Sequence, residues 1–128
     1  MKFSLLITSS PFETTQHESA LRFAKAALVD GHTIQRIFFY KDAVLAANAM
    51  TTPPQGQTSA FQDWQDFSKQ TGVTLHACIA NSLRRGIVDS TEAERYQLTG
   101  SNLGSAFSMV GLGEMTEVMS DSDKLVQF

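Results

Sequence analysis

The sequence is poor in cysteine. Its 128 residues include one cysteine, Cys78, and three prolines. A single thiol excludes a disulfide within the chain, and it falls short of any cysteine-based zinc or iron–sulfur ligand set. We therefore expect a reduced thiol in a soluble, cytoplasmic protein.

The sequence also lacks a long hydrophobic run and an excess of basic charge. The apolar stretch near the N-terminus covers only residues 5–7, which is much shorter than a signal peptide core or a membrane span. Lys and Arg total 10 against 13 for Asp and Glu, so the formal net charge is −3. Autonomous nucleic-acid binders are distinctly basic, so we expect neither a membrane nor a nucleic acid as a direct partner.

What the sequence does contain is an ordinary globular composition, with 42% hydrophobic and 18% charged residues, and we expect one domain over residues 1–128. Short apolar runs predict strands at residues 2–8, 33–40, 73–80, 107–110 and 125–128. Helical spacing predicts a first helix that opens with a capping box at residues 15–18 and stops at residues 30–31. Further helices are predicted at residues 43–50, 59–71, 89–98 and 112–119.

This alternation of strands and helices predicts the fold class. Parallel strands need crossover connections, and helices on both faces bury the apolar runs. We therefore expect an α/β protein, a three-layer sandwich with a mostly parallel central sheet of about five strands. In such sheets, ligands and reactive groups gather at the carboxyl ends of the strands. The segments at those ends are residues 8–12, 40–42 and 78–86.

Cys78 is the candidate reactive residue, because it lies near the end of the third predicted strand. Free cysteine is among the most often buried residue types, so simple packing is the alternative to a nucleophilic or sulfur-carrying thiol. A helical turn after the strand would favour the thiolate through its aligned backbone dipoles. His76 falls on the same face of the strand as Cys78, and Arg84 and Arg85 follow downstream; the roles of these three residues stay open.

Signatures of other chemistry are weak or missing. His17, His32 and His76 are widely spread and show no metal-ligand spacing, so no metal site is predicted. The glycine-rich segment 111–113 lacks the third glycine of a dinucleotide fingerprint, and no glycine run ends in Gly-Lys-Ser/Thr. We expect no cofactor, and a nucleotide- or flavin-binding module ranks below thiol chemistry.

The segment that begins at Cys78 reads CIANSLRRGIVD and runs into TEAE at residues 91–94. It resembles the TusD/DsrE family of sulfur-relay subunits. Asn81 and Ser82 stand in a turn that is typically alanine-rich in that family. The resemblance extends over essentially the whole chain through the segments DGH (30–32), FFY (38–40), SNL (101–103), GLG (111–113) and VQF (126–128).

This resemblance implies a DsrE-like fold and a sulfurtransferase that carries a persulfide on Cys78, with no metal or cofactor. It implies a TusA-like sulfur donor, a TusE- or DsrC-like acceptor, and a heterohexamer with TusB/TusC-like or DsrH/DsrF-like subunits. The sulfur would end in the 2-thio group of the tRNA wobble uridine, or the chain would serve oxidative sulfur metabolism as a DsrE-type subunit. A solitary thiol suits a persulfide carrier, because a second cysteine would discharge the persulfide as a disulfide.

A non-catalytic assembly subunit is the alternative from another class. Its motivation is a set of aromatic and methionine residues that would form a subunit contact: Phe107, Met109, Met115 and Met119.

Overall fold

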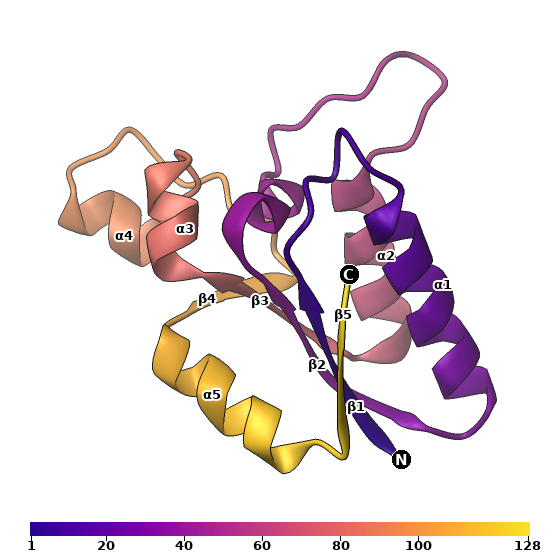
Figure 1. Ribbon diagram of the computed structural model, residues 1–128. Helices are drawn as coiled ribbons and strands as arrows, with labels where there is room; N and C mark the ends of the chain where they lie inside the picture. The colour runs from indigo at the N-terminus through magenta and orange to yellow at the C-terminus, as the bar shows by residue number, and fades with distance from the viewer.

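Five strands and six helical segments alternate along the chain (Figure 1). The structure is a computed structural model that describes residues 1–128, apart from the side chain of Val118. The order is β1 (Lys2–Ile7), α1 (Gln16–Val29), β2 (Thr33–Phe39), the 3₁₀ helix η1 (Lys41–Ala47), α2 (Ala60–Thr71), β3 (Thr74–Cys78), α3 (Ile79–Arg84), α4 (Ser90–Arg95), β4 (Phe107–Val110), α5 (Leu112–Asp121) and β5 (Lys124–Gln127).

The strands form one sheet in the order β4-β3-β2-β1-β5, and every neighbouring pair is parallel. Helices α1 and α2 cover one face of this sheet, and α5 lies on the other (Figure 1). Crossover helices on both faces follow from the parallel pairing, since a parallel strand cannot be reached by a tight hairpin. The predicted three-layer α/β sandwich is confirmed.

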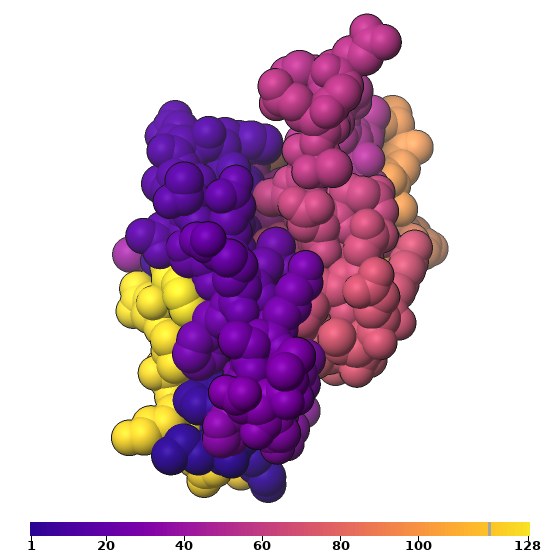
Figure 2. All heavy atoms as spheres, turned by 90° about the vertical axis from the view of Figure 1, so that its right-hand side faces the viewer, coloured from indigo at the N-terminus to yellow at the C-terminus, as the bar shows by residue number. Residues whose placement is uncertain are grey.

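The larger core lies between the sheet and α1 and α2. Leu5, Ile37 and Leu75 point to this side from three adjacent strands and are completely buried, as is Trp64 of α2. In the space-filling view, α1 and α2 lie side by side over this core, and the segment 51–59 projects beyond both helices (Figure 2). The layer under α5 is thinner, with Phe38 and Val110 as its buried members.

One residue of the expected subunit contact belongs to the core. Phe107 is 5% exposed, and its ring packs against the rings of Phe39 and Phe61 at centroid distances of 5.2 and 6.4 Å. Its expected place in a subunit interface was therefore wrong, because the first residue of β4 points toward α2. Met119 is 37% exposed and stays available on the surface.

Three helices start where the sequence predicts, and two of the three have a side-chain N-cap. Ser59 and Asp89 are the N-caps of α2 and α4, and each side chain accepts a hydrogen bond from an amide of the first turn. The capping box at Thr15 was wrong: within the described structure its side chain makes no cap hydrogen bond. Thr15 has a turn-like backbone rather than the extended one a cap requires, and the hydroxyl of Thr14 accepts from the amide of Gln16 instead.

Several element boundaries differ from the sequence prediction by one or two residues, and three differences are larger or concern the candidate site. The third strand was expected over residues 73–80, but β3 ends at Cys78, because its partner strand β4 ends at the paired residue Val110. The helix expected over residues 43–50 is the 3₁₀ helix η1, which begins at Lys41. Helix α4 stops at Arg95 instead of reaching residue 98, since Gln97 adopts a positive φ of 56° that no helix tolerates.

Candidate functional site

Cys78 is the last residue of β3 and the residue from which α3 begins. Side chains alternate along a strand, so Cys78 and Ala77 point to opposite faces of the sheet, although both residues belong to the large hydrophobic cluster. The thiol borders a small hollow beneath α5. The lining residues are Phe38, Phe39, Cys78, Val110, Gly111, Leu112 and Met115.

This hollow is narrow. Cys78 is 6% exposed, and the space beside it is too small for a water molecule. Leu112 and Met115 of α5 contribute to its wall, and Leu112 is itself 52% exposed. Leu112 and Met115 of α5 thus cover the thiol on one side, while Cys78 also packs with the large hydrophobic core.

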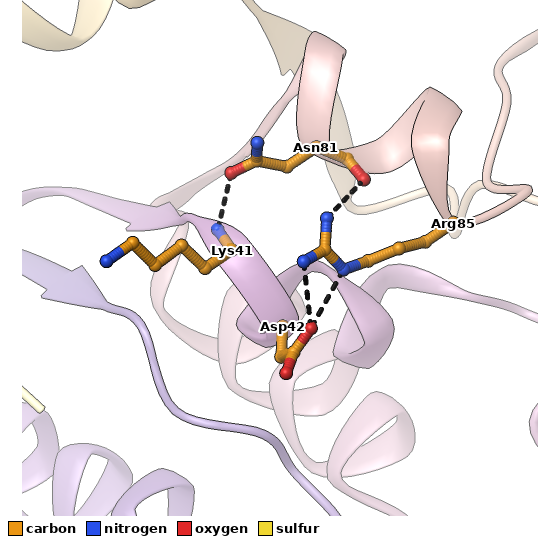
Figure 3. A network of polar contacts seen from close by, with 4 residues as sticks. All are labelled: Lys41, Asp42, Asn81 and Arg85. Atoms are coloured by element: carbon orange, nitrogen blue, oxygen red, sulfur yellow. Dashed lines mark hydrogen bonds and ion pairs between the residues drawn. The ribbon is translucent and has the colours of Figure 1, made fainter.

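The backbone that follows Cys78 is fixed by a polar network between α3 and η1 (Figure 3). The Nε and Nη2 groups of Arg85 both donate to Oδ1 of Asp42 at 2.9 Å, and Nη1 donates to the carbonyl oxygen of Asn81 at 3.1 Å. The side-chain oxygen of Asn81 accepts from the amide of Lys41. Lys41 holds a left-handed φ of 54°, so this hydrogen bond stabilises an otherwise unfavourable turn.

The network connects the segments at the carboxyl ends of β2 and β3. Residues 40–42 and 78–86 were expected to lie at this edge of the sheet, where functional groups gather in parallel α/β proteins. Its energy is small, on the order of 1 kcal/mol or less for an exposed ion pair, so its main effect is geometric. The sequence predicted no contact for Asp42 or Asn81. Their partners lie 43 and 40 residues away, and only the pairing of β2 with β3 brings them together.

The two arginines considered as neighbours of the thiol have other positions. Arg85 directs its guanidinium at Asp42, and Arg84 is exposed. Within the described residues, neither arginine is hydrogen-bonded to Cys78.

His76 lies in β3 two residues before Cys78 and is 7% exposed. Its ring packs against the ring of Phe38 with centroids 5.4 Å apart. Among the residues that the structure describes, neither ring nitrogen has a hydrogen-bond partner. Burial lowers the pKa of His76, and the positive charge of Arg36 lowers it further, while Glu114 of α5 opposes both effects.

His17 and His32 lie elsewhere. The His17 ring joins two elements: Nε2–H donates to the carbonyl of Ser9 at 2.7 Å, and Nδ1 accepts from the indole N–H of Trp64 at 3.0 Å. These partners define the neutral tautomer, and burial lowers the pKa of His17. His32 contacts the amino terminus at Met1. The described part of the chain contains no group of three histidine, cysteine or carboxylate side chains placed to hold a metal ion.

A wider groove, which Cys78 does not line, lies between residues 11–12 and the projecting segment 51–60, with a volume of about 340 Å³. Its walls are prolines, threonines, Phe12, Gln57, Ser59 and Ala60. The described residues of this groove carry no charged side chain, so it offers no acid–base group. Of the helices that the structure describes, none combines the length and the hydropathy needed to cross a bilayer.

The geometry defines a class: an all-parallel α/β protein whose single thiol ends a central strand beside a short helix. Residues 1–128 match the DsrE/DsrF-like family, and the chain belongs to it. It is 41% identical over 128 residues, with full coverage of both chains, to sulfurtransferase TusD of Enterobacter sp. (strain 638). The crystal structure of the ychN protein from E. coli has the same fold, with a TM-score of 0.78, 19% identity, and coverage of 100% of this chain and 99% of that one.

Proposed function

We propose that this chain is a sulfurtransferase that carries sulfane sulfur on Cys78 as a persulfide. One combined observation supports the proposal most strongly. The chain's single thiol lies at the carboxyl end of a central parallel strand, in a protein that is 41% identical along its whole length to a sulfurtransferase.

The reaction is an exchange between sulfur atoms. The Cys78 sulfur attacks the outer sulfur of a donor persulfide, the donor's S–S bond breaks, and the donor leaves as a thiol. A second exchange moves the same sulfur atom to an acceptor thiolate and restores Cys78. Each exchange breaks one S–S bond and forms another, so neither step needs an external oxidant or reductant.

Transfer requires that a partner's sulfur reach Cys78, which is 6% exposed. We propose that the first turn of α5 gives way to the partner. The turn begins at Gly111, which has no side chain to cap the helix, and contains Gly113, where glycine costs about 1 kcal/mol relative to alanine. Leu112 lies between these two glycines and lines the hollow beside the thiol. Displacement of Leu112 would open the thiol without disturbing the sheet.

Our proposals on domain extent, partners and final sulfur acceptor rest on the resemblance to the family. We propose one domain over residues 1–128 that receives sulfur from a TusA-like carrier and passes it to a TusE- or DsrC-like protein. We place it in a heterohexamer with TusB/TusC-like subunits that supplies the 2-thio group of the tRNA wobble uridine. The alternative is a DsrE-type subunit that works with DsrH/DsrF-like subunits in oxidative sulfur metabolism.

The test is intact mass spectrometry after incubation with a cysteine desulfurase, a TusA-like carrier and cysteine. We expect a gain of one sulfur atom that dithiothreitol removes and that Cys78→Ser abolishes. Wild-type protein alkylated beforehand is the matched control, because Cys78 is its single thiol. No gain on the wild type, or an undiminished gain on Cys78→Ser, would contradict the proposal.

A non-catalytic assembly role is the second candidate. It is favoured by apolar side chains exposed on α5 and β5: Leu112, Met119 and Leu125 are 52%, 37% and 39% exposed. In that case Cys78→Ser would leave cellular tRNA thiolation unchanged, while deletion of the chain would abolish it.

A further inference from the structure

His76 is buried without using its hydrogen-bonding capacity. A neutral imidazole has one N–H donor and one acceptor nitrogen, and both nitrogens of His76 lack a partner among the described residues. Burying an unsatisfied polar group costs roughly 1–3 kcal/mol, so such a group calls for an explanation. An apolar residue of similar size would pack against Phe38 without this cost.

The position of His76 offers that explanation. It lies on the same strand and the same face as Cys78, about 6.5 Å along the strand from it. Its ring contacts Phe38, which also lines the hollow beside the thiol, and Met115 of α5 packs against the cluster that Phe38 forms with Val110. The imidazole and the thiol therefore share the thin layer between the sheet and α5.

The charges around His76 favour a neutral ring with a free acceptor nitrogen. Arg36 faces it from β2 and Glu114 from α5, and the paired residue of β4, Ser108, carries no charge. Burial and Arg36 lower the pKa of His76 despite the opposing effect of Glu114. A neutral imidazole is the form that can accept a proton.

We propose that His76 accepts the proton of the Cys78 thiol during sulfur transfer. This inference rests on the proposed function of Cys78. The thiol proton moves to the imidazole as the Cys78 sulfur bonds to the outer sulfur of the donor persulfide. The donor's S–S bond breaks, its electron pair stays on the leaving thiolate, and the imidazolium returns the proton to that thiolate. No His76–Cys78 hydrogen bond is present in the described structure; such bonds often tighten only in the reactive complex.

The experiment measures the alkylation rate of Cys78 by iodoacetamide from about pH 5 to about pH 9, by intact mass, in the full chain. We expect a wild-type profile with two inflections, the lower one from His76. His76→Asn keeps a side chain of similar reach that does not titrate, so it should lose the lower inflection and react at least about tenfold more slowly at neutral pH. His32→Asn is the matched control, since His32 lies near the amino terminus, and it should behave like the wild type.

A second variant keeps His76 in place. Glu114 is exposed and raises the pKa of His76, so Glu114→Gln should move the lower inflection to lower pH without a loss of fold. If His76→Asn keeps the wild-type pH profile, or if the lower inflection of Glu114→Gln does not move, the inference about His76 is overturned. In either case the proposed function still stands, provided that Cys78 takes up sulfur. Absence of sulfur uptake in the wild type would overturn the proposed function itself.

Discussion

Replacing Leu112 by alanine should make Cys78 more reactive. Leu112 lies in the first turn of α5 and lines the narrow hollow beside the thiol. If modification of Cys78 requires that this cover move away, then a smaller cover lowers the free energy of opening. The alkylation rate would rise in proportion to the population of the open state.

The magnitude follows from the exposure of Leu112. Complete burial of a leucine side chain contributes about 1.5–3 kcal/mol, and Leu112 is 52% exposed, so its buried half contributes about 1 kcal/mol. Loss of about 1 kcal/mol from the closed state raises the open population, and with it the rate, about fivefold.

The assay is alkylation of the native protein by iodoacetamide, followed by intact mass, with the rate in denaturant as a reference for each variant. Met119→Ala is the matched control, because Met119 is on the same helix but does not line the hollow. Equal rates in Leu112→Ala and wild type, or an equal increase in Met119→Ala, would refute the idea that Leu112 gates the thiol.

Two predictions concern stability. The pKa values of His17 and His76 are lowered in the folded chain, so at mildly acid pH the unfolded chain binds protons that the folded chain does not, and stability falls as the pH falls. From about pH 7.5 to about pH 5.5 the loss reaches at most about 1.4 kcal/mol per histidine; urea unfolding at both pH values measures it, and an unchanged midpoint would contradict the reasoning. Gly104→Ala should destabilise the folded chain by about 1–3 kcal/mol, because the new Cβ would overlap the ring of Phe61. A thermal midpoint equal to that of the wild type would contradict this, since it would show that the ring moves aside freely.

Signals carried by a few neighbouring residues were read correctly from the sequence. Ser59 starts α2, which the sequence predicts over residues 59–71, and the helix ends at Gly72 with a φ of 74°. Asp89 starts α4. In each case the determinant is a side chain or backbone conformation within one helical turn of the boundary, so no distant contact is needed to predict it. Thr15 shows the limit of such signals. Its side chain caps no amide of α1, and the amide of Gln16 donates to the hydroxyl of Thr14.

The candidate site was predicted in part. The position of Cys78 near the end of a central strand follows from apolar periodicity and the sheet rule. Its cover does not, because residues 112–115 reach it only after β4 has paired with β3 and the chain has turned into α5. The ion pair of Arg85 with Asp42 likewise depends on a contact across 43 residues.

The sequence by itself determined where strands and helices alternate and which residue bears the single thiol, because these depend on local composition and spacing. The family resemblance rests on the motif that begins at Cys78 and on short matching segments along the chain. The tertiary structure alone decided that β5 adds beside β1, that α5 covers Cys78, and that His76 is buried without a hydrogen-bond partner among the described residues. Those features arise from packing between segments far apart in the chain, which no local pattern specifies.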